Sequence, residues 1–285
     1  QLDLLYRDRK GFALGHGCAV EWDTNNSVPT RLCTSVMPSY KVPPVVPREG
    51  MGSEHYSMRA YSTKSSLEDN EVLSLLENIP QEYEHWISNR EGEISSLSIE
   101  HQSIARSNLE VCRESLARIS NGIRLLAEDG NALTAFRLMN RAMVSQQIHY
   151  SRSTRKIDDD WEDLNESYDE LKPTQGWWRV FQLAFVLANL NGAHRSLDKN
   201  ERELVDLIWF PTGGGKTEAY LGLSAFTIFY RRLLDPTDSG CTVLMRYTLR
   251  LLTVQQFQRA AAMICACEQI RFENIETLGA DEISI

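Results

Sequence analysis

An apolar run followed by three glycines, a lysine and a threonine constrains this chain more than any other feature. Residues 204–210 read LVDLIWF, residues 211–217 read PTGGGKT, and residues 218–221 read EAYL. Large apolar residues in a short run predict a buried strand, and successive glycines permit a tight loop whose backbone N–H groups point inward. A helix beginning at Lys216 would aim its positive end at the same loop. Strand, glycine loop and helix in this order predict a phosphate-binding site.

ATP with Mg²⁺ is the ligand that we expect in this loop. Lys216 would place a positive charge on the outer phosphates, and Thr217 would supply a hydroxyl ligand for Mg²⁺. These two residues are the predicted catalytic residues, and Thr217 is the predicted metal ligand. The predicted ATP-binding residues are Arg179, Gln182, Thr212, Gly213, Gly214, Gly215, Lys216, Thr217 and Glu218. The alternative, a glycine-rich turn followed by an ordinary lysine, is disfavoured by the strand before the loop and the helix after it.

The chain ahead of the loop predicts a helical region behind an irregular N-terminus. Residues 1–65 contain five prolines and read as short strands and loops. Residues 66–157 read as a helical accessory region. Apolar spacing predicts helices over 99–128 and from Ala132 to about Tyr150, separated by a turn at 129–131, while Pro80 is expected to interrupt an earlier helix. Residues 158–176, with eight acids between 158 and 170, read as an acidic linker.

Residues 177–285 predict an α/β fold, the start of a parallel-sheet lobe. The expected order is a helix over 177–190, a strand over 204–210, a helix over 216–234, a strand over 241–247, a helix over about 251–272 and a strand beginning near Glu282. Alternating strands and helices favour a parallel sheet with helices on both faces. Asp281 and Glu282 do not read as the acidic Walker B motif, because no strand precedes them. We therefore expect the lobe to be incomplete in this chain.

The loop with its proline-threonine start, read PTGGGKT over 211–217, resembles the form found in superfamily 2 helicases and translocases. The general loop pattern has glycine where this chain has Phe210. Upstream, Arg179 and Gln182 resemble the Q-motif region of that superfamily, in which a glutamine amide suits the edge of adenine. Packing in the core is the competing interpretation for Gln182, and it is the one we prefer for most of the neighbouring aromatic residues, Trp177, Trp178, Phe181 and Phe185.

A second block, residues 241–256, resembles motif Ia of the same helicases. A strand there ends in a turn with threonine and arginine and enters a helix, an arrangement that can bind a nucleic-acid phosphate. The predicted nucleic-acid contacts are Thr248 and Arg250, with Arg246 and Gln255 as further candidates. Ion pairs with surface acids are the alternative for the two arginines.

Three blocks together, residues 208–223, 246–253 and 265–271, resemble the DrmA helicase family of bacterial DISARM anti-phage defence systems, and so do residues 4–7 and 15–22. The resemblance implies a RecA-like first lobe and an ATP-dependent DNA motor. It also implies a companion protein with a DUF1998 domain and a DNA methyltransferase in the same system. The alternative function is a nucleotide-gated DNA-binding or interaction scaffold without motor activity, with residues 66–150 as its contact surface. A P-loop ATPase that is not a helicase is disfavoured by the motif Ia block.

Composition limits the remaining possibilities. The net charge is −9, from 30 basic and 39 acidic residues, which disfavours a protein that coats DNA by bulk attraction. We expect a reduced, cytoplasmic protein for three reasons. The six cysteines form no CxxC pair, no apolar run is long enough to span a membrane, and the sequence shows no signal peptide. The first residue is Gln1, so we expect the chain to be a piece of a longer protein.

Overall fold

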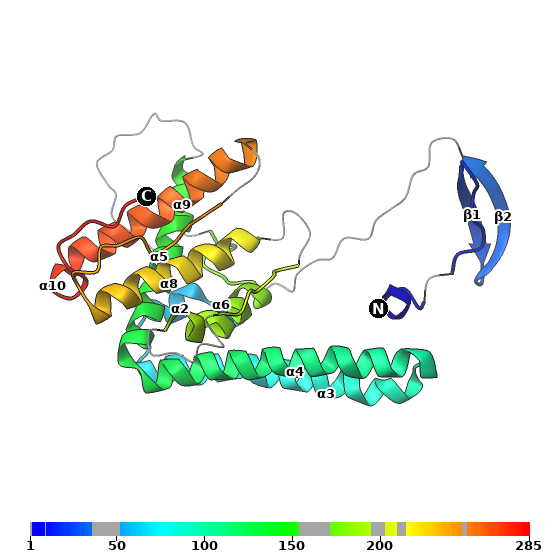
Figure 1. The fold of residues 1–285 in the computed structure, drawn as a ribbon, viewed down its shortest axis with the longest axis horizontal. Coiled ribbons are helices and arrows are strands. Elements are labelled where there is room, and N and C mark those ends of the chain that lie inside the picture. The colour runs from blue at the N-terminus through cyan, green and yellow to red at the C-terminus, as the bar shows by residue number, and fades with distance from the viewer. Residues whose placement is uncertain are drawn as a thin grey trace. The chain divides into compact units, whose positions relative to one another are not determined.

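A computed structural model describes residues 2–8, 10–35, 52–153, 172–194, 203–209, 215–246 and 250–285 of this protein. Its elements are α1 (Leu2–Leu5), β1 (Ala19–Asn25), β2 (Val28–Ser35), η1 (Glu54–Tyr56), α2 (Met58–Tyr61), α3 (Asp69–Glu93), η2 (Ile94–Ser96), α4 (Ile99–Glu128), α5 (Gly130–Ser153), α6 (Val180–Ala193), α8 (Lys216–Leu234), α9 (Arg250–Glu273) and α10 (Ile275–Leu278). Helices dominate these residues (Figure 1). The chain divides into two compact units, residues 1–45 with 87–112 and residues 46–86 with 113–285.

The smaller unit contains an antiparallel hairpin of β1 and β2. Its strands pair from Ala19 opposite Ser35 to Asn25 opposite Val28, with one irregularity beside Asp23. Asn26 and Ser27 form the two-residue turn with positive φ angles of 49° and 62°, the backbone that matches the twist of a hairpin. The expectation of short strands within residues 1–65 is thus met by this hairpin, whereas the runs that suggested them, Val42 and Val45–Val46, lie outside the described residues.

The larger unit has its core around helix α5. Helices α2, α8 and α9 pack against α5, and α6 packs against α8. Side chains from all of these helices, and from α3 and α4, bury in one hydrophobic cluster. The largest fully buried side chains of the cluster are Trp178, Tyr56, Tyr61, Tyr230, Phe136, Phe226 and Phe229.

The turn between α4 and α5 follows the sequence prediction. Asp129 is the single residue between the helices, and its Oδ1 accepts hydrogen bonds from the backbone N–H groups of Asn131 and Ala132 at 2.8 and 3.2 Å. Its Oδ2 accepts a hydrogen bond from the hydroxyl of Tyr230 at 2.8 Å, which connects the turn to α8. Burial raises the pKa of Asp129, but these hydrogen bonds outweigh it and lower the pKa below its ordinary value.

Most predicted helices are confirmed. The helix predicted over 216–234 is α8 at both bounds, the helix predicted over 99–128 is α4, and those predicted over 132–150 and 251–272 are α5 and α9 with slightly wider bounds. The helix predicted over 177–190 begins later, at Val180, because Trp177 and Trp178 pair through their backbone with the segment around Ser57 and Arg179 is extended.

The predicted interruption at Pro80 is wrong, because α3 continues through the proline. Proline removes one helical hydrogen bond and crowds the preceding turn. The lost bond is the one to the carbonyl of Leu76, and the amide of Asn78 does not replace it, because it donates to the carbonyls of Ser74 and Leu75 at 3.2 and 3.0 Å. Burial of Val72, Leu76 and Ile79 in the core offsets the cost.

The predicted parallel sheet is not shown by the described residues. Residues 204–209 and 241–246, within two of the predicted strands, have no regular secondary structure, and neither do residues 282–285. Val205, Leu207 and Trp209 are 95%, 82% and 87% exposed. An extended segment becomes a strand only beside a partner that takes its backbone hydrogen bonds. In the part of the chain that the structure describes, these segments have no such neighbour.

None of the described helices combines the length and the apolar character that crossing a membrane requires.

Candidate nucleotide site

Helix α8 begins where the sequence predicts the phosphate loop to end. Gly215 precedes the helix with a φ of 80°, a left-handed conformation that glycine adopts without strain. The first turn consists of Lys216, Thr217 and Glu218, whose side chains are half-buried. The positive end of the helix dipole therefore lies at the predicted phosphate position. The predicted loop residues outside the described part of the chain are Thr212, Gly213 and Gly214.

The side chain of Gln182 connects helix α6 to the last glycine of the loop. Its Oε1 accepts a hydrogen bond from the backbone N–H of Arg179, and its Nε2 donates to the carbonyl oxygen of Gly215, both at 2.7 Å. Gln182 is buried, so both bonds are shielded from water. A Cβ on Gly215 would lie 2.9 Å from Nε2 of Gln182 and 3.1 Å from Nη1 of Arg179. The structure thus brings together, at the start of α8, three residues that were predicted to bind one nucleotide, Arg179, Gln182 and Gly215.

The geometry gives Gln182 a task that the sequence did not indicate. Both ends of its amide bond to backbone groups, so the side chain fixes the end of the loop relative to α6. Recognition of adenine by this amide stays a prediction.

Trp178 anchors this corner of the site in the core. Its indole N–H donates to Oδ1 of Asn140 on α5 at 2.8 Å, and the amide of Asn140 donates to the carbonyl of Phe136 at 2.9 Å. On the other side, a Cβ on Gly222 of α8 would lie 2.7 Å from Trp178 Cη2. The predicted packing role of Trp178 is confirmed. Because Trp178 immediately precedes Arg179, the core sets the position of the residues that hold the loop.

Glu218 connects α8 to α9. Its carboxylate forms an ion pair with Arg259, and the side chains are 21% and 20% exposed. The predicted nucleotide helix and the helix that follows the predicted nucleic-acid turn are therefore joined by a partly buried pair. A direct contact of Glu218 with ATP stays a prediction.

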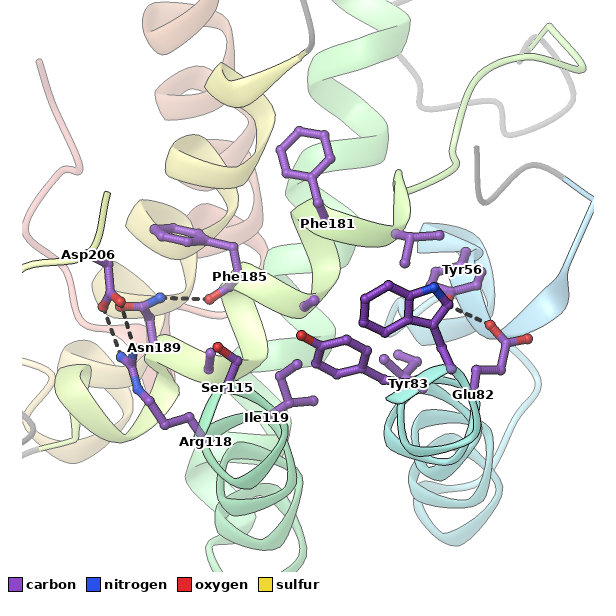
Figure 2. A pocket seen from close by; sticks show the side chains of 15 residues that line it. Tyr56, Glu82, Tyr83, Ser115, Arg118, Ile119, Phe181, Phe185, Asn189 and Asp206 are labelled. Atoms are coloured by element: carbon purple, nitrogen blue, oxygen red, sulfur yellow. Dashed lines mark hydrogen bonds and ion pairs between the residues drawn. The ribbon is translucent and has the colours of Figure 1, made fainter. Parts of the chain in front are cut away.

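A second attachment holds the segment that leads into the loop. Arg118 of α4 donates from Nη1 and Nη2 to the two carboxylate oxygens of Asp206, at 2.6 and 2.8 Å (Figure 2). The hydrogen bonds from Arg118 lower the pKa of Asp206 against the opposing effect of burial. Sequence analysis missed this pair. The available signal was Asp206 itself, the only charged residue in the apolar run 204–210.

The pair lies at one end of a cavity of about 490 Å³ lined by α3, α4 and α6. Its aromatic lining residues are Tyr56, Tyr83, Trp86, Phe181 and Phe185. Figure 2 shows the side chain of Tyr83 on the α3 side and those of Phe181 and Phe185 on the α6 side. The predicted packing role of the two phenylalanines is thus only partly met, because they line a cavity at the edge of the core.

The predicted nucleic-acid residues lie around the start of α9. Arg250 is the first residue of that helix, as the predicted turn-to-helix entry requires. Arg246 and Gln255 are exposed on either side. Thr248 lies outside the described residues. The structure places three of the four residues in one short stretch and leaves their role as a prediction.

Comparison with known proteins adds one finding. No family model matches the chain. Over 301 aligned residues, it is 36% identical to DISARM protein DrmA of Bacillus paralicheniformis, and the alignment covers 99% of this chain. The predicted resemblance to DrmA is confirmed. The similarity to DrmA extends far beyond the phosphate loop, through the accessory helices and the N-terminal hairpin. The chain spans 26% of the length of DrmA, so it corresponds to a portion of that protein.

Proposed function

We propose that this chain is part of an ATP-dependent superfamily 2 DNA helicase or translocase in DISARM anti-phage defence. The observation that carries the proposal is the meeting of Arg179, Gln182 and Gly215 at the N-terminus of α8, beside a sequence that reads PTGGGKT. Similarity to DrmA over 99% of the chain supports the defence context. Because the chain spans only a portion of DrmA, the motor activity belongs to the longer protein.

The residues at the start of α8 fit a triphosphate with Mg²⁺. Gly215 must be glycine here, because its φ is 80° and a Cβ would lie 2.9 Å from Nε2 of Gln182, while the N-terminus of α8 that it precedes is a favourable end for an anion. Lys216 would bring an ammonium group to the outer phosphates, and Thr217 would hold Mg²⁺ through its hydroxyl. The bound cation supplies charge neutralisation on the phosphates. Gln182 and Arg179 keep the loop end at a fixed place on α6.

A RecA-like sheet is the fold that we propose for this lobe in the longer protein. Val205, Leu207 and Trp209 lie at alternate positions, so in an extended segment they share one face. All three are exposed in the described structure. Parallel strands are buried on both faces, and residues elsewhere in a protein of DrmA's length would supply the neighbouring strands and covering helices.

DNA would contact the turn that enters α9. Thr248 and Arg250 are the proposed backbone-binding residues, with Arg246 and Gln255 beside them. The N-terminus of α9 adds a positive helix end. The net charge of −9 means that binding depends on this local patch and not on the whole surface.

The direct test is ATP hydrolysis by the full-length protein with and without DNA. Lys216→Ala should abolish hydrolysis, while Lys172→Ala, the same substitution at an exposed position, should retain wild-type turnover. Arg250→Ala should leave basal hydrolysis in place and reduce its stimulation by DNA. Wild-type hydrolysis by Lys216→Ala would end the proposal.

The scaffold alternative gives a different result in the same assay. Binding of ATP without hydrolysis, in a full-length protein that still engages DNA, would favour a nucleotide-gated scaffold over a motor. Co-purification of the full-length protein with a DUF1998-type companion tests the partner that the resemblance implies.

A further inference from the structure

The segment that leads into the phosphate loop carries one charge, and it is paired outside the nucleotide lobe. Asp206 stands in the middle of LVDLIWF, where a buried strand would exclude an isolated carboxylate. Its partner, Arg118, lies 88 residues earlier on α4 of the helical accessory region. The pairing gives this carboxylate a partner that it would need if the run were buried as a strand in the longer protein.

The geometry of the pair is that of a fixed attachment. Both carboxylate oxygens of Asp206 accept from the guanidinium group of Arg118, at 2.6 and 2.8 Å. Two parallel hydrogen bonds define orientation as well as distance. The side chains are 23% and 27% exposed, so water screens the pair less than an ordinary surface ion pair.

The helix that bears Arg118 is itself fixed. Ile119, next to Arg118, and Ile123, about one turn further along α4, are buried in the core cluster. At Gly122 the helix approaches α6 so closely that a Cβ would lie 1.9 Å from the carbonyl oxygen of Leu187. Arg118 therefore extends from a rigid platform and not from a free surface helix.

The same two packed helices hold both ends of the stretch from residue 206 to residue 215. Helix α4 holds its beginning through Arg118 and Asp206, and α6 holds its end through Gln182 and Gly215. Because α4 and α6 contact each other at Gly122, displacement of one attachment changes the span between the two. The predicted phosphate loop lies within this stretch.

We propose that Arg118 is a positioning residue for the phosphate loop, through which the accessory helix α4 sets the affinity of the site for ATP. The inference rests on the proposed function and adds a positioning residue to it. Arg118 acts through Asp206, because it holds Asp206 and Asp206 holds the chain that enters the loop.

The test measures the KM for ATP and kcat separately in the full-length protein. Arg118→Ala and Asp206→Asn should each raise the KM by about tenfold, within the usual range for coupling between sites, with a smaller effect on kcat. The charge exchange, Arg118→Asp with Asp206→Arg, should recover part of the loss. Arg113→Ala is the matched control, since Arg113 lies on the same helix and pairs with Glu84 of α3 at 3.4 Å, away from the loop segment.

The outcomes separate the inference from the proposed function. A wild-type KM in both Arg118→Ala and Asp206→Asn overturns the inference while Lys216→Ala remains inactive. A KM that rises equally in Arg113→Ala, or a charge exchange no better than its single variants, also overturns it, because general destabilisation then accounts for the effect. Hydrolysis by Lys216→Ala overturns the proposed function itself. Should Arg118→Ala not fold, the near-isosteric Asp206→Asn gives the deciding KM.

Discussion

Substitution of one glycine tests the contact between the accessory helices and the candidate nucleotide site. Gly122 lies inside α4, and a Cβ added there would lie 1.9 Å from the carbonyl oxygen of Leu187 on α6. Gly92, in α3, has nothing within 4 Å of an added Cβ. The same change, glycine to alanine, therefore meets backbone at one position and open space at the other.

Two effects of opposite sign decide the result at Gly122. Alanine favours a helix over glycine by about 1 kcal/mol. A carbon atom rests about 3.3 Å from a carbonyl oxygen at closest, so the 1.9 Å approach forces the helices apart by roughly 1.4 Å. Overpacking of this kind costs about 1–3 kcal/mol and sometimes more, and the obstacle is backbone that cannot rotate away. Because backbone is the obstacle, we take the upper end of that cost, about 3 kcal/mol, and expect Gly122→Ala to lower the free energy of unfolding by about 2 kcal/mol.

Urea unfolding followed by circular dichroism measures both variants. Gly92→Ala should be neutral or up to about 1 kcal/mol more stable, because only the helix preference operates there. Stabilisation of Gly122→Ala equal to that of Gly92→Ala would refute the close packing of α4 on α6. It would also remove the platform on which the role of Arg118 depends.

Three further outcomes follow from the contacts. Asn140→Ala should cost about 1–3 kcal/mol in urea unfolding, because the buried indole N–H of Trp178 loses its acceptor; an unchanged midpoint would contradict that bond. Hydrogen bonds from Arg271 lower the pKa of Glu268 below its ordinary 4.5. This pair therefore stabilises the fold above about pH 4.5, and its contribution is lost as pH falls through the lowered pKa. Glu268→Gln should make the free energy of unfolding less dependent on pH in acid, and an unchanged pH dependence would contradict the pairing. Gln182→Glu keeps the acceptor for the backbone N–H of Arg179 but sets a carboxylate against the carbonyl of Gly215. It should therefore weaken ATP binding in a calorimetric titration more than it lowers stability. Equal affinity would contradict the contact between Gln182 and Gly215.

Local sequence determined the helices well. Helix α8 begins after the glycines and ends before Asp235 and Pro236, and both signals lie within the segment itself. Helix α4 follows its own apolar spacing in the same way. The continuation of α3 through Pro80 depends on the burial of neighbouring apolar side chains in the core, which no local rule for proline includes.

The strands and the ion pair of Asp206 could not be predicted from local sequence, because both depend on partners elsewhere in the chain. The runs over 204–210 and 241–247 have strand composition, yet a strand requires a neighbour, and the described residues supply none. The partner of Asp206 likewise lies 88 residues away, so the lone charge could signal that a partner exists but not that it is Arg118. The motif around Lys216 was readable because the residues that it needs are consecutive.

In the candidate site too, the residues could be predicted from the sequence, but their hydrogen bonds could not. Arg179 and Gln182 were predicted from their order ahead of the loop, and the structure brings both to Gly215. The bonds that they use there, from one amide to two backbone groups, follow from the packing of Trp178 against α5 and α8.

Calorimetric titration of Mg²⁺-ATP into the full-length protein tests the central claim most directly. If the amide groups before Lys216 and its ammonium group hold a triphosphate, the wild-type protein binds one ATP per chain and Lys216→Ala does not bind it. Equal binding by Lys216→Ala, or no binding by the wild type, would contradict the assignment of this loop to ATP.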